Sequence, residues 1–219
     1  MIRIWRLLLV VSLVVNLVGA AALGLLVREQ GARGTLEASG LVEPRRPAFD
    51  FYARERFQGL PGQGVVLIGD SHVERGPWSE LLDRPVAVRG QSGQMIREAA
   101  GSIDVMTDGD AEVVVVWAGS NDVMSGRSPD QIETDMVDLL GRLHPSTRVV
   151  VLSVPPLAGF DSEVAAGNEA IGRAADQAGA TFVDVTVLLR GKLANDGVHL
   201  TADGYEAVSV RILPMLTSR

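Results

Sequence analysis

Five short runs of apolar, mostly β-branched residues constrain the fold of this chain more than any other feature. They occupy residues 65–68, 86–88, 113–117, 149–152 and 181–183. Runs that are short and apolar on both faces are typical of strands in a parallel sheet covered on both sides. Segments with the helical spacing of apolar residues lie around them, at residues 48–57, 95–106, 129–143, 163–178 and 201–216. This alternation predicts a doubly wound α/β domain around a buried parallel sheet.

A 21-residue segment without charge, Leu7 to Val27, precedes the α/β pattern. As a helix it would be roughly 30 Å long, about the thickness of a bilayer core. Arg3 and Arg6 stand before it. Because positive flanks stay in the cytoplasm, we expect residues 1–27 to form a transmembrane anchor, with the rest on the extracytoplasmic side. The alternatives are a buried core helix and a signal peptide, cleaved near the small residues 20–22, with secretion as the result.

Residues 28–46 have the composition of a linker, because glycine and proline punctuate them and charges of both signs alternate. The globular domain is therefore expected at residues 47–219. Residues 1–46 hold six Arg and three Glu, a net charge of +3. Because the whole chain has a formal net charge of −7, residues 47–219 have a net charge of −10. A surface of that sign repels a polyphosphate backbone, and no nucleic-acid partner is expected. The chain has no cysteine, which excludes disulfides, thiolate metal sites and a cysteine nucleophile.

Polar residues follow the apolar runs at the places where a doubly wound sheet binds its ligands, beyond the carboxyl ends of the strands. The segments concerned are residues 69–72, 89–93, 118–122 and 195–200. They supply the hydroxyl of Ser71, the backbone beside Gly90, the carboxamide of Asn121 and the pair Asp196 and His199. These are the groups that acyl transfer requires.

Each of these groups has a chemical role in such a reaction. Ser71 becomes a nucleophile when a base takes its proton, and the imidazole of His199 can do so near neutral pH. Asp196, three residues earlier, can accept the Nδ1 proton of that ring, although a backbone carbonyl can also orient a histidine. Backbone N–H groups and the Asn121 side chain can hold the oxyanion, where losing one donor costs about 3–4 kcal/mol of barrier.

Other polar residues near these segments are expected to have structural roles. Of the three histidines, His144 stands in a helix-end loop, and His72 adjoins the nucleophile but is expected to point away from it. Asp70 and Asp122 are expected to serve turn and cap hydrogen bonds. No Gly-x-Ser-x-Gly elbow and no Gly-x-x-x-x-Gly-Lys-Ser/Thr phosphate loop occurs in the sequence, which argues against an α/β-hydrolase and a P-loop enzyme.

Four segments, in this order, resemble the conserved blocks of the SGNH hydrolase superfamily, to which the GDSL-like esterases and lipases belong. They are Gly69-Asp70-Ser71, Gly90, Gly119-x-Asn121-Asp122 and Asp196-x-x-His199, and the resemblance spans residues 65–205. There are two departures. His72 replaces the leucine of the full GDSL pattern, and Val88 stands where the family often has an asparagine, two residues before Gly90.

The resemblance implies a flavodoxin-like, three-layer α/β/α sandwich with a five-stranded parallel sheet. It implies that Ser71 is the nucleophile, His199 the base and Asp196 its support. The oxyanion would be held by the N–H groups of Ser71 and Gly90 and by the Asn121 side chain. No metal and no cofactor is expected.

The expected activity is hydrolysis of a carboxylic ester through an acyl-serine intermediate. The loops after the apolar runs are short, which favours a shallow site and a short acyl group. With an extracytoplasmic domain, the ester could belong to a glycan or lipid of the cell envelope. An acyltransferase that uses the same acyl-enzyme, and a non-catalytic binding module on the same fold, are the alternatives.

Overall fold

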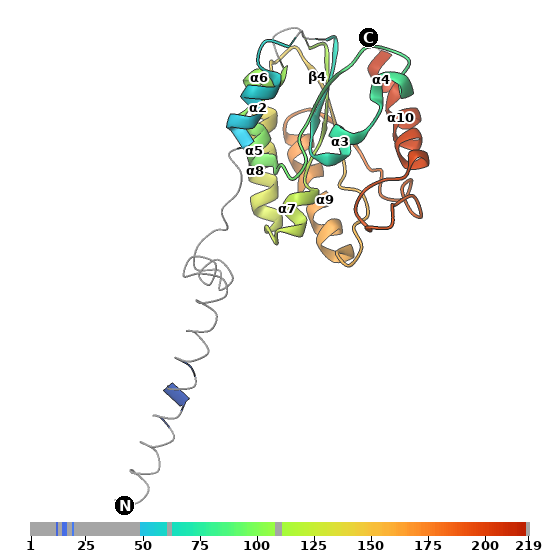
Figure 1. Cartoon of the computed structure of the whole chain (residues 1–219). Helices are drawn as coiled ribbons and strands as arrows, with labels where there is room; N and C mark the ends of the chain where they lie inside the picture. The colour runs from blue at the N-terminus through green and yellow to red at the C-terminus, as the bar shows by residue number, and fades with distance from the viewer. Residues whose placement is uncertain are drawn as a thin grey trace, which may run out of the picture. The chain divides into compact units, whose positions relative to one another are not determined.

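The computed structural model describes residues 12, 15, 16, 19, 49–60, 63–107 and 111–217 of the 219-residue chain. The chain divides into two compact units, Met1–Pro47 and Ala48–Arg219. The second unit holds all of the α/β fold (Figure 1). The predicted linker at residues 28–46 lies outside the described residues.

The predicted transmembrane segment also lies outside the described residues, apart from four positions. Ser12, Val15, Asn16 and Gly19 are helical and exposed. Within the part of the chain that the structure describes, no helix is both long enough and apolar enough to cross a membrane. The anchor at residues 1–27 therefore stays a prediction.

Five parallel strands form one sheet in the order β2-β1-β3-β4-β5. Their bounds are β1 Val65–Gly69, β2 Ala87–Gly90, β3 Val113–Trp117, β4 Arg148–Leu152 and β5 Thr181–Val183. This is the flavodoxin-like order, in which the direction of winding reverses between β1 and β3. The predicted five-stranded parallel sheet is confirmed, and each strand lies within two residues of its apolar run.

Nine helices of the described residues accompany the sheet. They are α2 Phe49–Phe57, α3 Ser71–Arg75, α4 Trp78–Leu81, α5 Ile96–Gly101, α6 Ile103–Thr107, α7 Ser120–Met124, α8 Pro129–Gly141, α9 Asp161–Gln177 and α10 Ala202–Thr217. The single helix predicted at residues 95–106 is two helices, because Gly101 ends the first and Ser102 separates it from the second. The short helices α3, α4 and α7 were not predicted, since four or five residues are too few to show a helical period.

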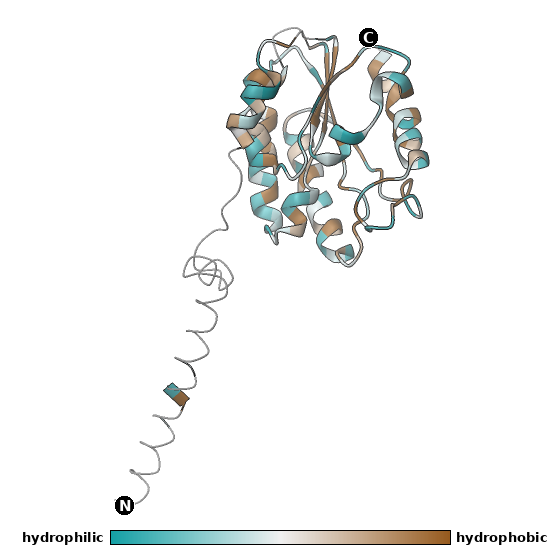
Figure 2. Cartoon of the chain, viewed as in Figure 1, coloured by the Kyte–Doolittle hydropathy of each residue, from teal (hydrophilic) through white to brown (hydrophobic). Residues whose placement is uncertain are grey.

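Successive residues of each strand point alternately into two cores, as the period of a strand requires. Val66, Val114 and Val151 pack with side chains of α2, α5, α6, α8 and α9. Leu67 and Val115 pack with side chains of α3, α4 and α10. Figure 2 accordingly shows apolar strands between helices that carry both polar and apolar residues. Full burial of such side chains stabilises the fold by roughly 1.5–3 kcal/mol each, and the result is the predicted three-layer sandwich.

Candidate active site

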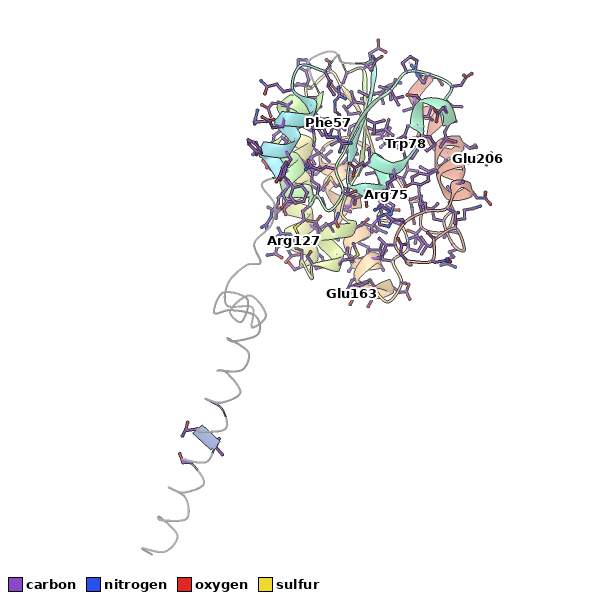
Figure 3. All side chains as sticks on the ribbon, in the orientation of Figure 1. Phe57, Arg75, Trp78, Arg127, Glu163 and Glu206 are labelled. Atoms are coloured by element: carbon purple, nitrogen blue, oxygen red, sulfur yellow. The ribbon has the colours of Figure 1, made fainter. Side chains whose placement is uncertain are left out.

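Ser71 follows the carboxyl end of β1, which lies between β2 and β3 in the sheet, and is the first residue of α3. The Asp70 carboxylate caps this helix by accepting the N–H of His72 at 2.9 Å, which agrees with the cap role expected for Asp70. Because an N–H at the start of a helix has no acceptor within that helix, the Ser71 N–H remains for a ligand. The turn needs Gly69, since a Cβ there would lie 1.9 Å from the Trp117 carbonyl oxygen. Arg75, the last residue of α3, is labelled in Figure 3.

His199 ends a tight turn that Asp196 organises. One carboxylate oxygen of Asp196 accepts the N–H groups of Val198 at 3.0 Å and of His199 at 2.9 Å. The other oxygen accepts the Nδ1–H of His199 at 2.6 Å. The hydrogen bond from the His199 ring, followed by those from the two N–H groups, holds the pKa of Asp196 well below its usual range. The Asp-x-x-His spacing therefore has a geometric cause, because one carboxylate fixes both the backbone and the ring of the histidine.

The second ring nitrogen of His199 reaches Ser71. Its Nε2 lies 2.9 Å from the Ser71 Oγ, although the two residues are 128 positions apart in sequence. With the Nδ1 proton directed at Asp196, Nε2 presents a lone pair to the serine hydroxyl. The structure thus brings together the three residues that the sequence singled out, Ser71, His199 and Asp196, in one hydrogen-bonded row.

One of the predicted oxyanion donors, Gly90, lies on the strand next to β1. Gly90 ends β2 and lies beside Gly69 in register, while Gly69 lies beside Trp117 of β3. A side chain at Gly90 would place its Cβ 2.3 Å from the Glu74 nitrogen, so α3 rests directly on the backbone of β2. Only glycine leaves room for this contact.

Asn121 is the second residue of α7, which follows β3. Its Nδ2 donates to the Gln94 carbonyl at 2.9 Å. Because a carboxamide carries two N–H donors, this bond fixes the side chain and leaves the second donor for a ligand. The Asn121 amide is thus anchored to the loop that follows Gly90.

His72 has a role that the sequence did not reveal. Its ring is 1% exposed, and both of its nitrogens have partners. Nδ1 lies 2.9 Å from Asp70 Oδ1, and Nε2 lies 3.0 Å from the Val198 carbonyl oxygen. Burial alone disfavours a charged ring, but the Asp70 carboxylate and these two bonds outweigh it and raise the pKa of His72. No spacing rule could have found this pair, since Val198 lies 126 residues away.

Asp122 makes the cap hydrogen bond expected of it, but to a different helix. Its Oδ2 accepts the N–H of Ile96, the first residue of α5, at 3.1 Å. The side chain is fully buried, and the Nε of Arg127 lies 3.6 Å from its Oδ1. Burial raises the pKa of Asp122 to about 7 despite these two partners. Asp122 and Asn121 therefore both tie the end of β3 to residues 94–96.

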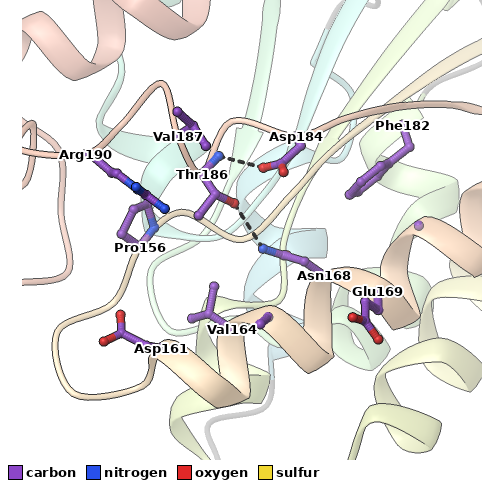
Figure 4. A pocket seen from close by; sticks show the side chains of 12 residues that line it. Pro156, Asp161, Val164, Asn168, Glu169, Phe182, Asp184, Thr186, Val187 and Arg190 are labelled. Atoms are coloured by element: carbon purple, nitrogen blue, oxygen red, sulfur yellow. Dashed lines mark hydrogen bonds between the residues drawn. The ribbon is translucent and has the colours of Figure 1, made fainter.

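A cavity of about 740 Å³ lies apart from this row, between α9 and the segment after β5 (Figure 4). Two of its polar side chains bond within the protein: Asn168 bonds the backbone of Val154, and the Asp184 carboxylate accepts the N–H of Thr186. It contains none of Ser71, His199 or Asn121, so we place the candidate site at the hydrogen-bonded row. Among the described residues, no group of three or more His, Asp or Glu side chains is arranged to hold a metal ion.

The fold and the site define a class of protein. A serine, a histidine and an aspartate joined by hydrogen bonds, at the carboxyl end of a parallel sheet, form the arrangement of the serine hydrolases. The strand order is flavodoxin-like, and the serine of the Gly69-Asp70-Ser71 segment begins a short helix. Both features are typical of the SGNH hydrolases.

The particular family follows from comparison with known proteins. Residues 67–207 match the GDSL-like Lipase/Acylhydrolase family. This match covers more than half of the chain, and the chain belongs to that family. The recognition made from the four sequence blocks is confirmed. No curated protein matches the chain.

Solved structures share the fold at low sequence identity. A structure described as a putative platelet activating factor from Streptococcus pneumonia has a TM-score of 0.68 and 20% identity, covering 94% of this chain and 99% of the other. A GDSL-like lipase from Bacteroides thetaiotaomicron has a TM-score of 0.66 and 20% identity, and the match covers 77% of this chain and 96% of the lipase. A carbohydrate esterase family 3 protein from Talaromyces cellulolyticus has a TM-score of 0.60 and 23% identity, and the match covers 69% of this chain and 95% of the esterase.

Proposed function

We propose that this protein is a serine esterase that hydrolyses carboxylic esters through an acyl-Ser71 intermediate. The observation that carries the proposal is the row in which Ser71 Oγ lies 2.9 Å from His199 Nε2 and His199 Nδ1 lies 2.6 Å from Asp196. Ser71 Oγ attacks the ester carbonyl carbon while His199 takes its proton. The bond to the alcohol oxygen then breaks as His199 returns that proton to the leaving alkoxide.

The second half of the reaction repeats these transfers with water. His199 removes a proton from a water molecule, whose oxygen attacks the acyl carbon and releases the carboxylic acid and the free Ser71 hydroxyl. Asp196 stabilises the imidazolium that forms in each half. The N–H groups of Ser71 and Gly90 and the amide of Asn121 are proposed to hold the oxyanion of both tetrahedral intermediates.

Solvent access to the row supports water as the acceptor of the acyl group. The side chain of His199 is 20% exposed, and that of Asp196 is 49% exposed. An acyltransferase would resolve the same intermediate with a sugar hydroxyl and would gain by keeping water out. Product analysis in the presence of a soluble glycan acceptor separates the two, since an esterase releases free acid and a transferase forms a new ester.

The proposed substrates are esters of short acyl groups, such as acetyl groups on a cell-envelope glycan or lipid. Support comes from a protein of similar fold described as a carbohydrate esterase and from another described as an acetyl xylan esterase. Turnover of nitrophenyl esters of increasing chain length, beside an acetylated glycan, tests this. A preference for long acyl chains would contradict it.

The nucleophile is tested by Ser71→Ala. Turnover of a small nitrophenyl ester and labelling by a fluorophosphonate are both expected to disappear, while the circular dichroism spectrum stays unchanged. Ser162→Ala is the matched control, because Ser162 is an exposed residue in the first turn of α9. If Ser71→Ala keeps its turnover, the acyl-Ser71 mechanism is wrong. If the unaltered protein neither reacts with the fluorophosphonate nor turns over any ester, the fold carries a non-catalytic module instead.

We also propose that residues 1–27 anchor the enzyme, with its domain on the extracytoplasmic side. The support is the uncharged run from Leu7 to Val27 and the arginines before it. Fractionation of expressing cells tests this, since an anchored chain stays with membranes after an alkaline wash. Recovery of a shortened chain in the medium would favour a cleaved signal peptide.

A further inference from the structure

A second hydrogen bond lies beside the one between Ser71 and His199. It joins His72, the residue after Ser71, to Val198, the residue before His199. Ser71 bonds His199, and their neighbours His72 and Val198 are joined from the ring Nε2 to the carbonyl oxygen at 3.0 Å. The Val198 carbonyl and the His199 nitrogen belong to the same peptide unit. That unit is therefore held on one side by His72 and on the other by Asp196, which accepts the His199 N–H at 2.9 Å.

Both nitrogens of the His72 ring face oxygen atoms that can only accept. Nδ1 lies 2.9 Å from an oxygen of the Asp70 carboxylate, and Nε2 faces the Val198 carbonyl. A neutral imidazole has one N–H, so it would leave a nitrogen lone pair against an oxygen lone pair at one of these contacts. Since side chains of both His72 and Asp70 are 1% exposed, such a contact would cost the full penalty of an unmade buried hydrogen bond. A ring protonated on both nitrogens satisfies both oxygens and balances the buried charge of Asp70.

We propose that His72 is a positioning residue of the active site, a doubly protonated ring that joins Asp70 to the Val198 carbonyl and thereby holds His199 against Ser71. This inference rests on the proposed esterase function, because it names a residue that acts through the base of that reaction. The surroundings of the ring agree with a fixed position. It lies between the indole of Trp117, at 5.3 Å between ring centroids, and the ring of His199, at 5.6 Å.

Two substitutions separate the two bonds of the ring. In His72→Gln the side-chain nitrogen reaches the position of Nε2 and can still donate to Val198. In His72→Asn it reaches only the position of Nδ1 and loses Val198. Because a displacement of about 1 Å in a catalytic group lowers the rate by about 10²-fold, we expect kcat of His72→Asn to fall by that factor with little change in KM. We expect His72→Gln to recover most of this loss.

The control is His144→Asn, because the exposed ring of His144 bonds Ser146 on a surface turn. Its kcat is expected to equal that of the unaltered protein. A purely structural role for His72 predicts a different result, in which both His72 variants lose activity in proportion to the fraction that unfolds. Equal kcat values for the two variants, after correction for the folded fraction, would overturn the proposal.

Nuclear magnetic resonance of the ring nitrogens tests the bonds without any turnover. The chain has three histidines, so single substitutions assign every ring. At pH 8, where a histidine in water is neutral, His72 is expected to show two protonated ring nitrogens in the full-length protein. The His199 ring signals are expected to shift in His72→Asn and to stay in place in His72→Gln. A singly protonated His72 would overturn the proposal, and so would His199 signals that stay unchanged in both variants. Either result would do so even if no ester were hydrolysed. Absence of turnover by the unaltered protein, with these signals as expected, would instead overturn the esterase proposal.

Discussion

Replacing Gly90 with alanine tests how closely the nucleophile helix depends on the neighbouring strand. A Cβ at this position would lie 2.3 Å from the Glu74 nitrogen and 2.8 Å from the Val73 carbonyl carbon. Ordinary contacts begin at 3.4 Å, so α3 must retreat by about 1.1 Å at Glu74. Both atoms are backbone atoms, which no side-chain rotation can move aside. Ser71 lies on the same short helix, three residues earlier, and must move with it.

The expected losses follow from this displacement. Overpacking of this kind costs about 1–3 kcal/mol of folding stability. In a domain of this size that corresponds to a fall in Tm of roughly 2–12 °C. Moving a nucleophile by about 1 Å is expected to lower kcat by about 10²-fold. The backbone N–H of residue 90 is retained in Gly90→Ala, so the loss would report displacement of Ser71 rather than removal of an oxyanion donor.

Steady-state kinetics with a nitrophenyl ester and thermal unfolding measure the two effects. Gly141→Ala is the matched control, since Gly141 ends α8 and a Cβ there meets no atom within 4 Å. This control is expected to keep its activity and to gain up to about 1 kcal/mol of stability. If Gly90→Ala retained the kcat and Tm of the unaltered protein, the contact between α3 and β2 would not control the position of Ser71.

Two further substitutions test the residues at the end of β3. Asn121→Ala is expected to lower kcat by about 10²–10³-fold through loss of an oxyanion donor, with Tm changed by only a few degrees; an unchanged kcat in steady-state assays would remove Asn121 from the site. Burial raises the pKa of Asp122 to about 7. Protonation of Asp122 therefore adds to the free energy of unfolding, fully below about pH 4, and this contribution is lost as the pH rises through about 7. Since asparagine resembles the neutral acid, the Tm of Asp122→Asn relative to the unaltered protein should rise between pH 5 and pH 8, and a constant difference would contradict this.

The amino-acid sequence determined the strands and the candidate residues of this protein. Apolar runs of three to five residues located every strand of the sheet, because a strand buried on both faces allows little else. The Asp196 and His199 pair was equally readable, since the contact that it makes spans only three residues. Local spacing fixes local geometry, and both features are local.

The tertiary structure alone decided how distant segments meet. The approach of His199 to Ser71, of His72 to Val198 and of Asp122 to Ile96 depends on the order of the strands and on the path of the loops. No periodicity in the sequence encodes such contacts between segments far apart along the chain. The need for glycine at position 90 became visible only when α3 was seen to rest on β2. The sequence therefore supplies the chemical groups, and the packing of helices on the sheet determines which of them touch.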